Sequence, residues 1–322
     1  MDNQERLIAV DGGATKTDMI LFDRTGTVIN RVIGGPSNSS EIGFERSIET
    51  LTILFEQLLK NHQKEEPIQS IHMALAGGGI GSNRARYERF LQDLFPDVPH
   101  IRTDSDAISA LNAGLRKEDG MVLIAGTGSA VFVRHAGQIH QVGGWGHLLS
   151  DEGSGYDIGR MGLRRVLQAY DGRMPPTLLT ELMRQAIGQP VQEAIQEIYD
   201  GGKRLIASLA PQVFLAMEKG DDAARSIIHE GANQLVLLVK AGSQFLHKQP
   251  YLVVLSGGLW NASNNLLEKL VFNELGPQYQ AIKPSLPPVF GSAIDAMTEA
   301  GYFVNDDFEK KFKQSLDLIS VD

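Results

Sequence analysis

The sequence has no cysteine among its 322 residues. This absence excludes disulfide bonds, iron–sulfur clusters held by thiolates, and zinc sites built on cysteine. The sequence also lacks an apolar run near the roughly 18 residues that a membrane span needs. Its first residues, Met1–Glu5, lack the basic and apolar regions of a signal peptide. We therefore expect a cytoplasmic protein without a membrane partner.

Basic residues are too few to give the protein a positive surface. The chain has 30 Lys and Arg against 39 Asp and Glu, a formal net charge of −9. Nucleic acids and anionic membranes require a basic face, so neither is an expected partner. With 42% hydrophobic residues the composition is that of a globular protein. At about 100–200 residues per domain, the length predicts two domains.

Two glycine-rich turns lie between apolar segments that favour strands. The first turn, Asp11–Asp18, separates Leu7–Val10 from Met19–Phe22. The second, Ala125–Ser129, lies in the same way within Met121–Val133. Both patterns predict β-hairpins whose glycines let the backbone approach a ligand closely. A third glycine motif, Ser256–Gly258, follows an apolar strand further along the chain.

The remaining patterns predict an α/β protein with a weak internal repeat. The order β-β-β-α-β-α-β-α is expected over the first half, and it restarts near residue 118. The predicted strands are 27–32, 71–75, 100–103, 138–142 and 251–255, and the predicted helices include 44–59, 84–95 and one that opens at 104–106. A final helix is expected around 293–303, and the tail from Asp306 is expected to be a solvated helix or a frayed end.

The three glycine motifs offer backbone N–H groups, which bind anions such as phosphates. None matches the P-loop or the dinucleotide-binding fingerprint, because each of those opens a helix. The chain resembles the superfamily of actin, hexokinase and the heat-shock ATPases. Asp11–Thr17 looks like its first phosphate motif, Gly126–Ser129 like its second, and Ser256–Gly258 like its adenosine motif.

This resemblance implies two ribonuclease-H-like domains with a nucleotide cleft between them. The small N-terminal domain is expected to span residues 1–117 and the large C-terminal domain residues 118–322. The last helix is expected to pack across the domain boundary. A homodimer is also expected.

The segment Gly143–Ser154, which reads GGWGHLLSDEGS, is the most specific part of the sequence. It looks like the corresponding segment of the N-acetylglucosamine kinases, which are related to the activator ATPases of benzoyl-CoA reductase. The resemblance runs from residue 7 to about 300, although residues 171–250 carry little of it. It implies transfer of phosphate from ATP, with Mg²⁺, to N-acetylglucosamine at the 6-hydroxyl. Glucosamine and N-acetylmuramic acid are the alternative substrates.

Two carboxylates are candidates for the base that accepts the proton of the sugar hydroxyl. Asp106 follows a predicted strand and enters a helix, as the catalytic aspartate of the family does. Asp104 stands two residues earlier and is the second choice. One of the two is expected to be a structural carboxylate at the helix start, favoured there by the helix dipole.

The resemblance also implies which residues bind ATP. Asp11 is expected to organise Mg²⁺ through water, and Lys16 either contributes charge or is solvated at the hairpin tip. Ala207 is expected to face adenine. The expected ATP-binding residues are Gly12, Gly13, Thr15, Lys16, Gly126, Thr127, Gly128, Ala207, Gly257 and Gly258.

Sugar binding requires hydrogen-bonding groups and a limited apolar wall. Asn38 and Asp151 look like the family's residues that contact the sugar, and Trp145 is either a pocket wall or a core aromatic. The expected sugar-binding residues are Asn38, Asp106, Ser129, Gly144, Trp145, Gly146 and Asp151.

Three other functions are alternatives to the kinase. An activator ATPase holds an iron–sulfur cluster through cysteines, and this chain has none. An actin-like or chaperone-like ATPase gives no reason for the Trp145–Ser154 segment. A sugar-responsive repressor would need a DNA-binding extension, whereas the chain starts almost directly at its first strand and is acidic.

Overall fold

The computed structural model describes residues 5–62, 66–79 and 81–319. The residues before Glu5, on which the signal-peptide argument partly rests, lie outside this part of the chain. Two compact units form, and the chain crosses between them twice. The first unit consists of the described residues of Met1–Lys117 and Pro284–Asp322, and the second of Glu118–Lys283.

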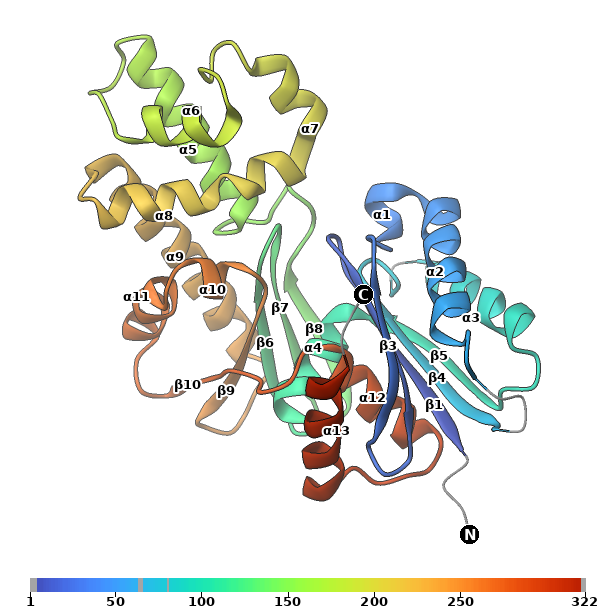
Figure 1. Ribbon diagram of the computed structural model, residues 1–322. Helices are drawn as coiled ribbons and strands as arrows, with labels where there is room; N and C mark the ends of the chain where they lie inside the picture. Colours follow the sequence, from blue (N-terminus) through green and yellow to red (C-terminus); the bar gives the residue numbers. More distant parts are fainter. Residues whose placement is uncertain (1–4, 63–65, 80, 320–322) are drawn as a thin grey trace. The chain divides into compact units, whose positions relative to one another are not determined.

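The first unit is built on a five-stranded sheet with the order β3-β2-β1-β4-β5 (Figure 1). Its strands are β1 (Arg6–Gly12), β2 (Thr17–Asp23), β3 (Val28–Gly34), β4 (Ile68–Leu75) and β5 (His100–Ser105). Strand β2 is antiparallel to both β1 and β3, whereas β4 runs parallel to β1 and β5 runs parallel to β4. The helices are α1 (Ser39–Ile42), α2 (Phe44–Leu58), α3 (Asn83–Leu94), α4 (Asp106–Leu115), α12 (Val289–Glu299) and α13 (Asp306–Leu318).

Both faces of this sheet are covered by helices. Alternate residues of β1 point to opposite faces and therefore pack in two different hydrophobic cores. Ile8 and Val10 pack with α2 and α3, whereas Leu7 and Ala9 pack with α12 and α13. Parallel strands buried on both faces read as continuous apolar runs, which is the pattern of Leu7–Val10.

The C-terminal segment departs from the sequence-based expectation. By chain order the sequence predicts that it belongs to the large domain of residues 118–322, whereas its described residues, 284–319, belong to the first unit. The tail from Asp306 is a helix, but it is not simply solvated, since Phe308, Phe312 and Leu316 are buried. Phe312 lies 4.9 Å from Phe290 between ring centroids. These aromatic contacts cover the second face of the β1 sheet, and hydrophobic burial of this kind outweighs sequence proximity.

The second unit repeats the first in its connectivity. Its sheet has the order β10-β9-β6-β7-β8, in which β7 is antiparallel to both β6 and β8, whereas β9 runs parallel to β6 and β10 runs parallel to β9. The strands are β6 (Gly120–Ala125), β7 (Ser129–His135), β8 (Gln138–Gly143), β9 (Tyr251–Ser256) and β10 (Tyr279–Ile282), the last of which the sequence did not predict.

A largely helical segment connects β8 to β9. Its helices are α5 (Gly155–Tyr170), α6 (Leu179–Ile187), α7 (Ile195–Ser208), α8 (Ala210–Glu218) and α9 (Asp222–Ser243), and after β9 come α10 (Leu259–Ala262) and α11 (Leu266–Leu275). In the described part of the chain, no helix is both long and apolar enough to cross a membrane. The two equivalent sheets confirm the predicted α/β fold with two ribonuclease-H-like domains.

Candidate functional site

The first glycine turn is the tip of the β1–β2 hairpin. The amide of Gly13 donates to the carbonyl of Lys16 over 2.9 Å, which closes the turn. A Cβ on Gly12 would lie 2.2 Å from Ser37 Oγ, so a side chain at Gly12 would collide with the loop that follows β3. Thr15 and Lys16 are exposed. The turn therefore presents its polar residues outward from a tightly packed base.

The loop after β3 is tied to this turn. Thr17 Oγ1 lies 2.8 Å from both the Gly35 carbonyl and Ser37 Oγ. Asn38 follows; its side-chain oxygen accepts from Ser40 N over 3.1 Å and caps α1. Its amide nitrogen makes no hydrogen bond among the described residues and stays available for a ligand. A cap of this kind fixes the side chain at a helix start.

Asp11 lies in a cluster of negative charge. Burial raises its pKa well above the usual value, and the charges of Asp106 and Asp18 raise it further. A hydrogen bond from Ser109 and the charge of Lys16 act in the opposite direction. Carboxylates that raise each other's pKa lie close together. The structure thus brings together Asp11 and Asp106, which are 95 residues apart, at the ends of β1 and β5.

Asp106 begins α4. The N-cap of that helix is Ser105, whose Oγ accepts from Ala107 N over 3.3 Å and lies 3.2 Å from Asp106 Oδ1. Burial raises the pKa of Asp106, while the Ser105 hydroxyl and the backbone amides of Ala107 and Asp106 lower it. Among the described residues Asp106 has no ion pair. A carboxylate held in this way can accept a proton from a bound hydroxyl.

Asp104 has different surroundings. It is buried, it pairs with Arg84, and Arg102 Nε lies 3.0 Å from its Oδ2. Two guanidinium groups therefore occupy both oxygens of its carboxylate. Asp104 fixes the end of β5 immediately before Asp106.

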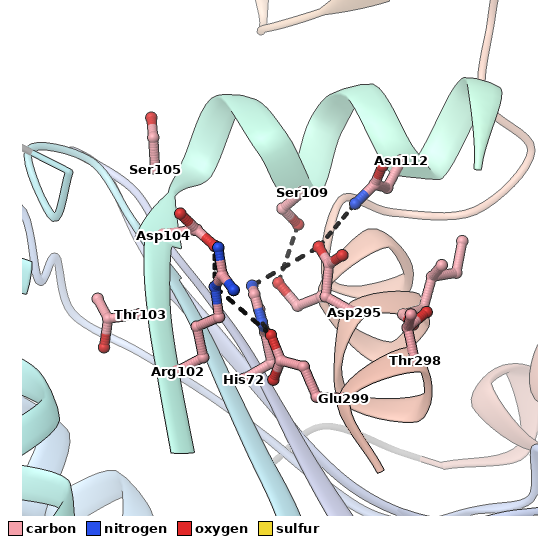
Figure 2. Close-up of polar contacts among 12 residues, drawn as sticks. His72, Arg102, Thr103, Asp104, Ser105, Ser109, Asn112, Asp295, Thr298 and Glu299 are labelled. Carbon is pink, nitrogen blue, oxygen red and sulfur yellow. Dashed lines mark hydrogen bonds and ion pairs between the residues drawn. The ribbon is translucent and has the colours of Figure 1, made fainter. Parts of the chain in front are cut away.

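A buried polar network continues from Arg102 into α12 (Figure 2). Arg102 Nε lies 3.7 Å from Glu299 Oε1, and His72 Nδ1 lies 3.1 Å from the same oxygen. His72 Nε2 lies 3.6 Å from Asp295 Oδ2, which accepts from Asn112 Nδ2 over 2.6 Å. Helix α12 thus connects β4, β5 and α4 through charged groups. No sequence pattern pointed to this network, because its members are up to 227 residues apart.

The Gly77–Gly79 turn lies between two predicted site residues. A Cβ on Gly77 would lie 3.2 Å from Asn38 Oδ1, and one on Gly79 would lie 3.6 Å from Ser105 Cβ. The turn therefore contacts Asn38 on one side and the residue before Asp106 on the other. In the first unit, the predicted residues Asp11, Gly12, Asn38 and Asp106 gather where β1, β4 and β5 end.

In the second unit, close backbone approaches gather the other predicted glycines. A Cβ on Gly126 would lie 3.7 Å from Gly257 Cα and from Gly258 N. The amide of Gly155 donates to the Gly126 carbonyl over 2.8 Å, and a Cβ on Gly155 would lie 3.4 Å from the Ala207 carbonyl. The second hairpin turn, the motif after β9 and Ala207 thus come together at the ends of β6 and β9.

Asp151 is held against the same hairpin turn. Its Oδ1 accepts from Ser129 N over 3.3 Å, and a Cβ on Gly128 would lie 3.0 Å from its carboxylate. Ser129 Oγ donates to the Glu152 carbonyl over 2.7 Å. Lys203 Nζ lies 3.0 Å from Asp151 Oδ2, and sequence reasoning did not identify this lysine. Its only signal was the pair Gly201-Gly202 before it.

The rest of the Gly143–Ser154 segment is largely exposed. Trp145 is 67% exposed, so the alternative of a core aromatic is wrong. Gly144 packs against Ala130, since a Cβ there would lie 2.8 Å from the Ala130 Cβ, whereas nothing lies within 4 Å of a Cβ on Gly146. Both glycines have positive φ angles, +72° and +92°, which favour glycine. Trp145 therefore stands on a tight turn.

The described residues contain no group of three or more His, Asp or Glu side chains that could hold a metal ion. Mg²⁺ usually binds through one or two carboxylates together with substrate phosphates. Asp11 fits that requirement, because a cation would relieve the repulsion that raises its pKa. Its neighbour Asp18 is already neutralised by Arg31, whose Nη2 lies 2.6 Å from Asp18 Oδ2.

The chain is similar to known proteins over most of its length. The profile of the BadF/BadG/BcrA/BcrD ATPase family matches residues 8–296. The chain is 32% identical over 305 residues to the N-acetylmuramic acid/N-acetylglucosamine kinase of Clostridium acetobutylicum, with 91% of this chain and 98% of that protein covered. It is 27% identical over 315 residues to the N-acetyl-D-glucosamine kinase of Dictyostelium discoideum, with 92% and 98% covered.

A solved structure shares the fold. The crystal structure of a candidate N-acetylglucosamine kinase from Chromobacterium violaceum superimposes with a TM-score of 0.74 and 24% identity. The match covers 89% of this chain and 97% of that one. Both ribonuclease-H-like units therefore have counterparts in a solved protein.

Proposed function

This chain belongs to the BadF/BadG/BcrA/BcrD ATPase family, and from that membership we propose that it is an ATP-dependent amino-sugar kinase that phosphorylates N-acetylglucosamine. One observation carries the choice of substrate. The match to the kinase of Clostridium acetobutylicum, named for N-acetylmuramic acid and N-acetylglucosamine, extends over 98% of that protein at 32% identity. The second relative, from Dictyostelium discoideum, is also named for N-acetyl-D-glucosamine.

Asp106 is the general base of the proposed reaction. It accepts the proton of the attacking hydroxyl, which we assign to the 6-position, as the oxygen attacks the γ-phosphorus of ATP. The support is its position at the start of α4 and its lack of an ion pair among the described residues. Asp104 is less suited, since Arg84 and Arg102 occupy its oxygens.

The proposed nucleotide contacts are made mainly by backbone amides of the glycine turns. Such amides bind phosphate oxygens without a dedicated cation. Mg²⁺, when bound, neutralises charge on the phosphates, and Asp11 is the residue that would hold it through water. The residues assigned to ATP are Gly12, Gly13, Thr15, Lys16, Gly126, Thr127, Gly128, Ala207, Gly257 and Gly258.

The proposed sugar contacts are polar groups with little steric competition. Asn38 offers an amide nitrogen, and Asp151 offers its carboxylate, whose buried Oδ2 accepts no hydrogen bond among the described residues. Trp145 supplies an exposed aromatic face. The complete set assigned to the sugar is Asn38, Asp106, Ser129, Gly144, Trp145, Gly146 and Asp151.

Several finer expectations stay predictions: the nucleotide cleft, the homodimer and the cytoplasmic location. Glucosamine and N-acetylmuramic acid stay alternative substrates. Outside the kinases, an actin-like or activator-type ATPase is the alternative, and it would hydrolyse ATP without a sugar.

A coupled ADP-release assay tests the proposal. The purified protein is given ATP and Mg²⁺ with N-acetylglucosamine, glucosamine, N-acetylmuramic acid or no sugar. We expect the highest kcat/KM with N-acetylglucosamine and little ADP release without sugar. The phosphorylated position is read by NMR of the product. Equal ADP release with and without every sugar would overturn the kinase assignment.

A further inference from the structure

The carboxylate of Asp151 is almost completely enclosed. Asp151 is 3% exposed, and its backbone φ of +67° lies in a region that non-glycine residues rarely adopt. Such local strain persists where the surrounding structure enforces it, and it occurs often at functional sites. Among the described residues, its carboxylate accepts a single hydrogen bond, the 3.3 Å one from Ser129 N. A buried charge with so few donors requires a compensating charge.

Lys203 supplies that charge. Its Nζ lies 3.0 Å from Asp151 Oδ2, and its side chain is 20% exposed. The contact is an ion pair rather than an aligned hydrogen bond, since Oδ2 has no hydrogen-bond donor among the described residues. The charge of Asp151 is therefore balanced by Lys203, and its buried Oδ2 has no aligned hydrogen-bond donor among the described residues.

A break in α7 allows Lys203 to reach Asp151. The helix is interrupted at Gly202, which has φ 54° and ψ −146°. After the break, Ile206 and Ala207 pack on α5, where a Cβ on Gly159 would lie 2.0 Å from the Ile206 carbonyl. Residues three and four apart share a helix face, so Lys203 lies on the face that holds Ile206 and Ala207. The ion pair therefore joins Asp151, which has an unusual backbone conformation, to Lys203, which directly follows the unusual conformation at Gly202.

We propose that Lys203 is a positioning residue for sugar binding: its ion pair orients the Asp151 carboxylate beside the second hairpin turn, so that this carboxylate accepts hydrogen bonds from sugar hydroxyls. This inference rests on the proposed function, because it takes Asp151 as a sugar ligand. The proposed role of Lys203 differs from a phosphate contact, because in a phosphate contact the lysine would bind ATP directly.

Kinetics of three variants test the inference. Lys203→Met removes the charge and keeps much of the length, and Lys203→Arg keeps the charge. Arg204→Met is the matched control, since Arg204 is the exposed neighbour. We expect Lys203→Met to raise KM for N-acetylglucosamine by about 10- to 100-fold and to change KM for ATP by less than about threefold. Lys203→Arg and Arg204→Met should stay within about threefold of the wild type.

A double-mutant cycle with Asp151→Asn distinguishes a lysine that acts through Asp151 from a lysine that binds ATP directly. If Lys203 acts through Asp151, Lys203→Met should change KM for the sugar by less than about twofold in the Asp151→Asn background. An undiminished effect in that background, or an effect on KM for ATP alone, would overturn the inference. The same cycle is measured on urea unfolding, where additive single effects would also contradict a direct pair. A wild type that phosphorylates no sugar would refute the proposed function, whereas an active wild type with an unchanged Lys203→Met would refute this inference alone.

Discussion

His72 Nδ1 lies 3.1 Å from Glu299 Oε1, although 227 residues separate the two in the chain. His72 is completely buried on β4, and its other ring nitrogen faces Asp295. Burial alone would lower the pKa of His72. The hydrogen bond to Glu299 and the charges of Asp295, Glu299 and Asp104 outweigh burial, so the pKa is raised. The imidazolium form is therefore favoured in the folded protein.

This raised pKa predicts a specific dependence of stability on pH. The unfolded value is near 6.5, so the stabilisation from the protonated ring is fully present below about pH 6.5. It is lost as the pH rises through the higher folded value. We expect the free energy of unfolding, measured by urea titration, to fall with rising pH by more in the wild type than in His72→Gln. Parallel curves for the two proteins would contradict this prediction.

The two carboxylates at the start of α4 should respond differently to neutralisation. Asp106→Asn should lower kcat by roughly 10²- to 10⁴-fold, the usual contribution of a general base. Asp104→Asn should keep kcat within about tenfold and lower the free energy of unfolding by about 1–3 kcal/mol, because Arg84 and Arg102 lose their partner. ADP release and urea unfolding measure the two effects. If Asp106→Asn were nearly normal and Asp104→Asn inactive, the assignment of the base would reverse.

Magnesium should be essential, and its requirement should depend on Asp11. Removing divalent cations with EDTA should abolish ADP release, and added Mg²⁺ should restore it. Asp11→Asn should raise the Mg²⁺ concentration for half-maximal rate by about tenfold or more. The matched control is Asp18→Asn, since Asp18 faces Asp11 across the hairpin but is paired with Arg31. An equal shift in both variants would argue against a specific role for Asp11.

Substitutions at two adjacent glycines after β9 should have different effects, one on stability and the other on ATP binding. Gly257 has a φ of +106°, and its Cβ would lie 2.4 Å from the Ala125 carbonyl, whereas nothing lies within 4 Å of a Cβ on Gly258. Gly257→Ala should therefore lower the free energy of unfolding by about 1–3 kcal/mol. Gly258→Ala should keep stability within about 0.5 kcal/mol and raise KM for ATP. Unfolding and steady-state kinetics check the pair, and equal losses of stability would contradict the distinction.

The apolar patterns were sufficient to predict the duplicated sheets. Leu7–Val10 and Met121–Ile124 are strands because their side chains are buried, and the glycine turns after them are hairpins because the strands on either side pair in register. Strand β10 was missed, since Tyr279–Ile282 is a short, partly exposed edge strand. An edge of this kind carries little of the hydrophobic periodicity from which strands are predicted.

By itself, the sequence determined the local elements and the chemistry available to them: glycine turns that expose backbone amides, a pair of aspartates before a helix, and no thiol for any metal cluster. Only the tertiary structure decided how those groups are partnered. It placed α12 in the first unit, paired Asp104 with Arg84 and Arg102, and brought Lys203 to Asp151. The reason is physical: turns and strands follow from neighbours in the chain, whereas the partner of a buried charge is set by packing between distant segments.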